Sequence, residues 1–330
     1  MRRPPAVARV LERVTKTARE HEMFTPGDAV LVACSGGPDS TCLLYALHHL
    51  RRLLKIRLAI FHFDHRIRSD SAKDADYVRR LADRLKLPFH LRTAEDAPRQ
   101  GESVEAWARA ARSLAGEVVS DEIGARRLAE GHTLDDQAET VLMALLRGGD
   151  LHALVGIRPV LGAQVQPLLD VTRQDVEAFC RSLGLRPRLD PTNRDTRMLR
   201  NALRLRGIPA LERATGRQIR GPIARTADLL RPVEEEWLRV ARPPQEIGGS
   251  DDAYRLRAEL LTGLSPSIAR EAIRTVLHGL GVPAAQESID AVLDLAVGRT
   301  GRRRDLPNGL KARREREYVS LSRTSPESRV

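Results

Sequence analysis

A glycine-rich turn in the first half of the chain places two serines and a carboxylate between an apolar run and a helical pattern. The apolar run covers residues 29–33, and the helical pattern starts near residue 39. Two consecutive glycines let the backbone approach a ligand closely with its N–H groups turned outward. The first helical turn adds unpaired N–H donors and a partial positive charge, so the segment predicts a phosphate cradle. Its members are Ser35, Gly36, Gly37, Pro38, Asp39 and Ser40.

An ordinary turn between a strand and a helix, capped by an aspartate or a serine, is the alternative for this segment. The turn is not a Walker A motif, because no Gly-Lys-Ser/Thr follows, and it is not a GxGxxG fingerprint. Cys34 and Cys42, on either side of it, are interpreted as packing residues.

A second group of reactive side chains follows further along the chain. Asp136 and Glu139 lie three residues apart and Asp135 and Glu139 four apart, so a helix carries these carboxylates on one face, just after His132. Such a cluster beside a phosphate cradle is unfavourable unless a cation arrives. Either an ammonium group or Mg²⁺ carried by a nucleotide would satisfy it, the Mg²⁺ through Asp39 or Asp136, and no metal site built from protein ligands alone is expected. The alternative is a solvated helical turn stabilised by the helix dipole.

Two further pairs of residues are candidates for a site, one at the end of an apolar run and one along a helical pattern. Phe63 and His65 come at the end of an apolar run, where a doubly wound fold presents contacts for base and ribose. Arg109 and Arg112 follow one face of a helical pattern. Glu–Arg pairs of ordinary surface type are the alternative for these arginines.

The elements that must position these residues alternate between short apolar runs and longer amphipathic stretches. This alternation predicts an α/β fold, with a doubly wound, Rossmann-like parallel sheet and helices on both faces. A helix with Thr172 as its N-cap is expected after the last strand. The expected strands are residues 29–33, 58–63, 88–92, 127–130 and 165–168, and the expected helices lie near 39–53, 71–86, 103–120 and 134–147.

The second half of the chain has a different sequence pattern. From about residue 205 the pattern is almost purely helical, interrupted by a Pro/Gly-rich linker around 241–252. Near the end, a basic segment predicts a β-hairpin turning at Asn308-Gly309. We therefore expect a catalytic domain over 1–210 and a smaller, mainly helical domain over 211–330 that ends in this hairpin.

The charge of the chain is concentrated in two places. The 330 residues carry a net charge of +11. Residues 194–231 hold ten arginines against three acidic residues, and residues 302–317 hold seven basic residues against three acidic ones. Charge gathered in this way indicates a polyanionic partner, and a general preference for arginine is the alternative. Aromatic residues make up only 3%, which argues against base-stacking platforms.

Cysteine usage and hydropathy indicate the compartment. The three cysteines form no CxxC pair, and no apolar run reaches the ~20 residues that a bilayer span needs. The basic opening of the chain lacks the apolar stretch of a secretory signal. A cytoplasmic protein without a membrane partner is expected, and the sequence leaves its oligomeric state open, a homodimer included.

The segment Ser35-Gly-Gly-Pro-Asp-Ser40 resembles the SGGxDS loop of the PP-loop ATP pyrophosphatases. The resemblance implies that ATP is cleaved between its α and β phosphates to adenylate a carbonyl oxygen, with residues 35–40 holding the pyrophosphate. Three more segments narrow it to the tRNA(Ile)-lysidine synthase family: residues 61–69, residues 131–148, and Asp190-Pro-Thr-Asn193 together with Arg200-Asn-Ala-Leu-Arg204.

Membership of that family implies an ATP-dependent ligase that joins L-lysine to C2 of the wobble cytidine of isoleucine tRNA with a CAU anticodon. The product reads AUA instead of AUG. The resemblance implies roles for the residues that match its motifs. These are Asp39, Arg109, Arg112, His132 and Asp136 in catalysis, residues 35–40 with Phe63 and His65 in ATP binding, and Asp135, Asp136, Glu139, Asn193, Arg200 and Arg204 in binding lysine or tRNA.

Two rival functions use the same loop or fold. A tRNA sulfurtransferase would need a set of catalytic or cluster-binding cysteines, which the absence of CxxC disfavours. A tRNA-binding protein with an inactive nucleotide fold is disfavoured by the intact Ser35–Ser40 loop and by Asp136. The family pattern commonly has an arginine before Pro167, where this chain has Gln166, so no role is assigned there. How isoleucine tRNA is told from methionine tRNA, and which base acts in catalysis, stay open.

Overall fold

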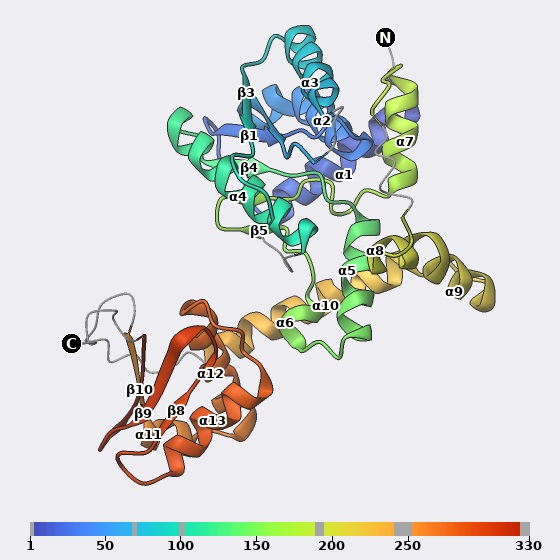
Figure 1. The fold of residues 1–330 in the computed structure, drawn as a ribbon. Coiled ribbons are helices and arrows are strands. Elements are labelled where there is room, and N and C mark those ends of the chain that lie inside the picture. Colours follow the sequence, from blue (N-terminus) through green and yellow to red (C-terminus); the bar gives the residue numbers. More distant parts are fainter. Residues whose placement is uncertain (1–2, 68–70, 99–102, 189–194, 241–252, 324–330) are drawn as a thin grey trace. The chain divides into compact units, whose positions relative to one another are not determined.

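The computed structural model describes residues 3–67, 71–98, 103–188, 195–240 and 253–323. The chain divides into two compact units, residues 1–230 and 231–330, each described here by itself (Figure 1). The first unit extends past the boundary at residue 210 that the sequence suggested. One reason is an ion pair between Arg220 and Asp135 (Nε–Oδ1 3.1 Å), which ties the segment after residue 210 to helix Leu134–Leu146.

The first unit is built on a six-stranded sheet in the order β3-β2-β1-β4-β6-β5. All neighbouring strands are parallel except β5 and β6, which form an antiparallel pair. The expected α/β fold is thus confirmed, although the last expected strand is shorter than predicted and pairs with an unpredicted β5. The strands are β1 (Ala29–Ala33), β2 (Arg57–Asp64), β3 (Phe89–Thr93), β4 (Arg127–Ala129), β5 (Val160–Leu161) and β6 (Gln164–Val165).

Both faces of the central strands are buried, as a parallel sheet requires. In β1, Val30 and Val32 belong to one hydrophobic cluster, to which α1, α2, α3 and α7 contribute, while Leu31 faces a second cluster formed with α4. The helices are α1 (Pro5–Glu20), α2 (Pro38–Leu54), α3 (Ala72–Leu85), α4 (Val104–Ile123), α5 (Leu134–Leu146), α6 (Leu151–Leu154), α7 (Arg173–Ser182), α8 (Leu199–Ala202), a π-helical turn (Leu203–Gly207), α9 (Ile208–Thr215) and α10 (Arg220–Val240).

The four expected helices of the first half are present, and Thr172 caps α7 by accepting a hydrogen bond from the Asp175 backbone N–H. Helix α1 was not predicted. Its buried Val7, Val10 and Val14 recur at helical spacing and cover the sheet side that α2 and α7 share.

The carboxyl ends of β1, β2 and β4 lie at one edge of the sheet. Strand order reverses between β1 and β4, because β2 and β3 lie on one side of β1 while β4 and β6 lie on the other. Open α/β sheets bind ligands at such a switch point. The glycine-rich turn follows β1, and His132 follows β4, so the fold brings both to this edge.

The second unit combines helices with an antiparallel sheet in the order β7-β10-β9-β8. Leu310, Ala312, Val319 and Leu321 face its hydrophobic core. The turn at Asn308-Gly309 is confirmed and joins β8 to β9, whereas β7 was not predicted. Its elements are β7 (Ala253–Arg257), α11 (Ala258–Gly263), α12 (Pro266–Gly279), α13 (Gln286–Val297), β8 (Arg303–Asp305), a 3-10 turn (Pro307–Gly309), β9 (Leu310–Arg314) and β10 (Tyr318–Arg323).

The expected linker at 241–252 falls outside the described residues. Within the described ranges, no helix combines the length and apolar character that crossing a bilayer requires.

Candidate active site

The loop after β1 is organised by its own serines. The Ser35 backbone N–H donates to Ser40 Oγ (3.1 Å), and the Ser40 hydroxyl donates to the Gly37 carbonyl (3.2 Å). Ser35 Oγ in turn accepts from the Gly37 N–H (3.4 Å). These bonds hold the loop closed ahead of α2, which begins at Pro38 with Asp39 in its first turn.

Glycine is required at two positions around this loop. Gly36 has φ +86°, a left-handed conformation that side chains with a Cβ disfavour. Gly131, after β4, lies so close to α2 that a Cβ there would come within 3.2 Å of backbone atoms of Asp39 and Ser40. The close approach places the residues that follow β4 directly beside the start of α2.

The carboxylate of Asp39 lies at this junction with little access to water. Burial raises the pKa of Asp39 from 3.8 to about 6, although Arg173 opposes the shift. Its Oδ1 is buried without a hydrogen-bond partner among the described residues, and Arg173 Nη2 lies 4.0 Å from Oδ2. A buried, unpartnered carboxylate oxygen beside a phosphate loop suits a hard cation such as Mg²⁺.

Asp136 is more fully engaged than its sequence position suggested. It forms a capping box with Thr133, whose backbone N–H (2.9 Å) and hydroxyl (2.7 Å) both donate to Oδ2. Arg173 (3.3 Å) and Arg204 (3.2 Å) donate to Oδ1. Burial by itself would raise the pKa of Asp136, but Arg173, His132 and the bonds from Thr133 outweigh it and lower the pKa.

Glu139 is the most buried carboxylate of the cluster, with a side chain only 1% exposed. Arg204 binds it with two parallel bonds of 2.7 Å, and Arg200 Nε lies 3.4 Å from Oε2. Arg200 and Arg204 therefore face the carboxylates. Bidentate arginine–carboxylate pairs of this kind are strong and directional.

Asp135 points away from its neighbour on the helix. It accepts from the Arg173 backbone N–H (2.8 Å) and pairs with Arg220 (3.1 Å), so it joins α5 to the starts of α7 and α10. Arginine side chains thus balance the cluster that we expected to need an incoming cation. The four carboxylates are Asp39, Asp135, Asp136 and Glu139, and the four arginines are Arg173, Arg200, Arg204 and Arg220.

The segment that carries Arg204 is a π-helical turn between α8 and α9. Pro209, near the start of α9, has no backbone N–H to donate, and its ring excludes the regular α-helical path four residues earlier. Such turns are frequent at functional sites.

An aromatic group lies at the carboxyl end of β2. The rings of Phe63 and His65 meet edge to face at 4.7 Å between centroids, and His65 meets Trp107 of α4 at 6.2 Å. Burial, with Arg112 and His62, lowers the pKa of His65 to about 4, so its ring is neutral at physiological pH. His65 Nδ1 and Trp107 Nε1 are both buried with no hydrogen-bond partner in the described part of the chain.

The other candidates fall at different places. Arg112 lies with Nη2 3.9 Å from Glu130 Oε1, and Arg109 is exposed on the same helix. His132 Nδ1 is bonded to Gln166 Oε1 (2.9 Å). Asn193 lies outside the described residues.

Sequence reasoning missed four residues here: Arg173, Trp107, Glu130 and Gln166. Arg173 carried a local signal, because it directly follows the predicted N-cap Thr172 at the start of a helix. Gln166 stood out only as a departure from the family pattern. Its contacts, like those of Trp107 and Glu130, join distant segments, which no local motif encodes.

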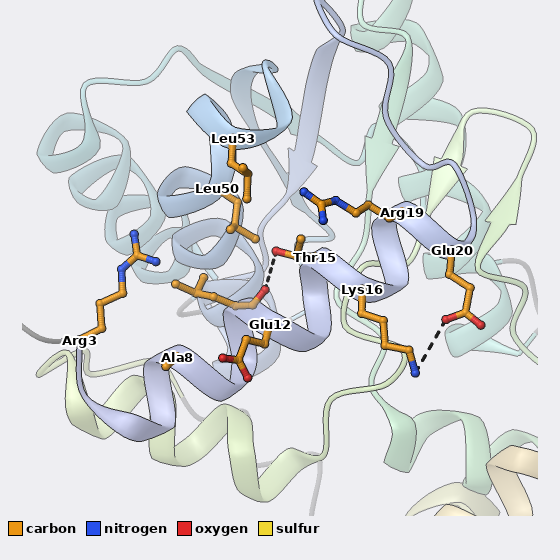
Figure 2. Close-up of a pocket in the computed structure, with 10 residues that line it drawn as sticks. Arg3, Ala8, Glu12, Thr15, Lys16, Arg19, Glu20, Leu50 and Leu53 are labelled. Atoms are coloured by element: carbon orange, nitrogen blue, oxygen red, sulfur yellow. Dashed lines mark hydrogen bonds and ion pairs between the residues drawn. The ribbon is translucent and has the colours of Figure 1, made fainter.

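A surface hollow of about 730 Å³ lies elsewhere, between α1 and α2. Figure 2 shows its lining, with Leu50 and Leu53 on α2 and the pair of Lys16 and Glu20 (4.0 Å) on α1. None of the predicted site residues lines it.

Replacing Glu139 with alanine should strongly destabilise the first unit. The change removes the buried carboxylate that Arg204 and Arg200 share and leaves these two half-buried guanidinium groups with Asp136 and Thr140 as partners. Breaking a buried pair from one side costs about 3–5 kcal/mol. Urea unfolding should show the loss as a lower midpoint. Arg197→Gln is the control, because its exposed pair with Asp195 should leave the midpoint unchanged. An unshifted midpoint for Glu139→Ala would show that the pair adds nothing to folding.

Comparison with known proteins identifies the family. A PP-loop domain model matches residues 7–211. A tRNA(Ile)-lysidine synthase from Symbiobacterium thermophilum is 37% identical over 323 residues, which cover 92% of this chain and 67% of that protein. The chain belongs to the tRNA(Ile)-lysidine synthase family. Another member, from Dehalococcoides mccartyi, is 32% identical and covers 94% of this chain and 69% of its own length.

A solved structure supports the fold alone. A U34-tRNA thiolase from Methanococcus maripaludis, with its [4Fe-4S] cluster, superimposes with a TM-score of 0.59 at 18% identity, covering 68% of this chain and 79% of that one. The PP-loop sheet of the lysidine synthase family is therefore shared with an enzyme of different chemistry.

Proposed function

We propose that this protein is an ATP-dependent ligase that joins L-lysine to C2 of the wobble cytidine of isoleucine tRNA with a CAU anticodon. The reaction forms lysidine, changes the codon read from AUG to AUA, and releases AMP and pyrophosphate. The observation that carries the proposal is a PP-loop that opens onto a carboxylate–arginine cluster, in a chain with family relatives along 92% of its length.

The first step adenylates the cytidine. The C2 oxygen attacks the α-phosphorus of ATP and pyrophosphate leaves, which turns a poor leaving oxygen into a good one. The backbone N–H groups and hydroxyls of residues 35–40 suit the departing pyrophosphate. Phe63, His65 and Trp107 suit the adenine, since two of their ring nitrogens have hydrogen-bonding capacity to spare. Arg109 and Arg112, which both lie on α4, would bind the phosphate oxygens of ATP.

Asp39 would hold the Mg²⁺ that accompanies ATP, because its Oδ1 is buried and no described residue hydrogen-bonds to it. When bound, the ion withdraws charge from the phosphate oxygens. Asp136 is a weaker candidate, since both of its oxygens already accept hydrogen bonds.

The second step transfers lysine. Its ε-ammonium has a reference pKa of about 10.4, so the amine must lose a proton before it can attack. Asp136 and Glu139 would attract the ammonium, and Arg200 and Arg204 would bind the carboxylate of the amino acid. The family resemblance left lysine or tRNA open for these two arginines, and their contacts with Glu139 favour lysine. Asn193 stays a tRNA-binding candidate.

The second unit offers a surface suited to RNA. Arg303 lies directly opposite Arg313 across β8 and β9, and Ser320 lies between Arg313 and Arg255 in the same row. Like charges placed opposite one another destabilise a sheet, and a polyanion relieves this repulsion. We propose that this face contacts tRNA phosphates together with Arg302 and Arg304, which alternate with Arg303 and are exposed at the edge strand.

Changing Arg302, Arg303 and Arg304 together to glutamine should weaken tRNA binding and flatten its salt dependence. Each lost phosphate contact lowers the slope of log K against log salt by about 0.7 to 0.9. Filter binding at several salt concentrations measures the slope. Arg270→Gln, which removes an arginine paired with Asp290 in the same unit, is the control. A slope equal to that of the wild type would show that Arg302, Arg303 and Arg304 are ordinary solvated residues without phosphate contacts.

The burial of the cysteines argues against the rival function, that of a tRNA sulfurtransferase. Cys34, Cys42 and Cys180 are buried and unpaired. Burial raises the pKa of each thiol, to about 11 for Cys34 and about 12 for Cys180, so none favours the thiolate that sulfur transfer needs.

One assay tests the function directly. The protein is incubated with ATP, labelled lysine and bulk tRNA, and the RNA is recovered. Label in the RNA, with AMP and pyrophosphate as products, supports the proposal; unlabelled RNA would overturn it. A reducing, cytoplasmic setting belongs to the proposal, and a homodimer stays a prediction for sedimentation to test.

A further inference from the structure

A chain of three polar side chains runs from β4 to β6 beside the candidate site. Gln166, only 5% exposed, donates from Nε2 to Glu130 Oε2 (2.9 Å). Its Oε1 meets His132 Nδ1 at 2.9 Å. Glu130 and Gln166 belong to neither the loop nor the carboxylate cluster, so the functions assigned above leave this chain unexplained.

The direction of these hydrogen bonds follows from the donors and acceptors available. An ionised carboxylate only accepts, so Gln166 must turn its NH₂ group toward Glu130. Its carbonyl oxygen then faces His132, and since a carbonyl also only accepts, Nδ1 of His132 must carry a hydrogen. Arg112 Nη2 lies 3.9 Å from Oε1 of Glu130, the carboxylate at the far end of this chain of hydrogen bonds. A neutral His132 therefore has its free lone pair on Nε2.

The second step lacks a free proton acceptor among the described carboxylates of the cluster. Glu139 accepts from Arg204 at both oxygens, and Asp135 accepts from the Arg173 N–H and pairs with Arg220. Both oxygens of Asp136 accept from Thr133, Arg173 and Arg204, and its pKa is lowered. Asp39 is assigned to the metal. His132 lies at the start of α5 and acts electrostatically on Asp136, and no contact described in the structure occupies its Nε2.

We propose that His132 Nε2 accepts the proton of the lysine ε-ammonium, and that Gln166 and Glu130 are positioning residues that hold His132 in the required tautomer. This inference rests on the proposed function. The charged groups that face the imidazole are Glu130 after β4, Asp136 on α5 and, beyond Glu130, Arg112 on α4. Glu130 and Asp136 both stabilise the imidazolium that forms.

Lysine transfer moves two protons and replaces the C2–O bond with a C2–N bond. One ammonium proton passes to Nε2, and the freed lone pair of the amine forms the bond to C2. The C2–O bond breaks with its electrons going to the oxygen of AMP, which leaves. The second amine proton goes to a phosphate oxygen of the departing AMP, and the imidazolium returns its proton to water.

Gln166→Met tests the positioning role, because methionine keeps the length of the side chain and removes both hydrogen bonds. Two measurements are made: the ¹⁵N spectrum of His132, which reports the tautomer, and single-turnover rates of pyrophosphate release and of lysine transfer. We expect a mixed tautomer and a roughly 10- to 100-fold slower transfer, with pyrophosphate release within about threefold of wild type. Gln164→Met, two residues earlier in the chain, is the matched control, since it removes a hydrogen bond to Ser113 and should change neither measurement.

A double exchange separates positioning from packing. Glu130→Gln with Gln166→Glu places a carboxylate against Nδ1 and an amide beyond it, so it should restore both the single tautomer and most of the transfer rate. A Gln166→Met variant with the wild-type tautomer and rate, or one that slows both steps equally, would overturn the inference. If Gln166→Met does not fold, the exchange decides alone: a mixed tautomer or unrestored transfer overturns the inference. If the wild type transfers no lysine, the proposed function fails, while the spectra still test the hydrogen-bond chain.

Discussion

Asp39→Asn should abolish pyrophosphate release from ATP while making the protein more stable. The carboxylate charge is needed to hold the cation that accompanies ATP, and an amide oxygen binds Mg²⁺ far more weakly. We expect a loss of roughly 10³-fold or more, since electrostatic stabilisation of the transferring phosphoryl group depends on it. The measurement is pyrophosphate release in the presence of tRNA.

The expected gain in stability follows from the raised pKa of Asp39. Because the pKa of Asp39 is about 6 in the folded protein and 3.8 in its ordinary state, the folded form binds the proton more tightly. Stability from this group is complete below pH 3.8 and is lost as the pH rises through 6. A shift of this size is worth about 3 kcal/mol, so Asp39→Asn should unfold at a higher urea concentration at pH 8, with no difference from wild type near pH 4.

Asp28→Asn is the control for this pair of measurements. Asp28 is also buried, but it bonds to the Thr25 backbone N–H ahead of β1 and lies outside the loop. It should retain pyrophosphate release. An active Asp39→Asn enzyme would contradict the assignment, and so would ADP and phosphate as the main products of the wild type.

The parts of the site that the sequence predicted are those encoded by neighbouring residues. The strand, turn and helix around residues 29–54 form one continuous segment, and their order alone places Asp39 at a sheet edge. The α5 carboxylates were predicted for the same reason, because helical spacing puts them on one face.

The partners of those carboxylates depended on tertiary structure. Arg173 and Arg204 meet Asp136 from positions 37 and 68 residues away, and no spacing rule connects them. The capping role of Asp136 was visible, since Thr133 and Asp136 have the spacing of a capping box. The sequence therefore suggested a cluster whose negative charges have no positive partners. In the structure, arginines from three other segments neutralise those charges.

Asp136→Asn should reduce lysine transfer by several orders of magnitude while tRNA binding and pyrophosphate release persist. With Asp136 ionised, the four carboxylates of the cluster balance its four arginines; the variant leaves one positive charge in excess. A unit charge about 4 Å from an ammonium group, at an effective dielectric constant near 20, is worth about 4 kcal/mol, or roughly 10³-fold. The loss should appear chiefly as a raised KM for lysine or a slower transfer in single turnover.

Asp175→Asn is a matched control, because Asp175 occupies the same capping position in α7, where it bonds to the Thr172 hydroxyl (2.7 Å). Both variants weaken a helix cap, at about 1 kcal/mol each, but only Asp136 contacts Arg173 and Arg204. Slow transfer in Asp136→Asn with normal transfer in Asp175→Asn would separate the lysine-binding charge from helix capping. Transfer near the wild-type rate in Asp136→Asn would make Asp136 a capping residue only, and lysine would then have to be held by Glu139 alone.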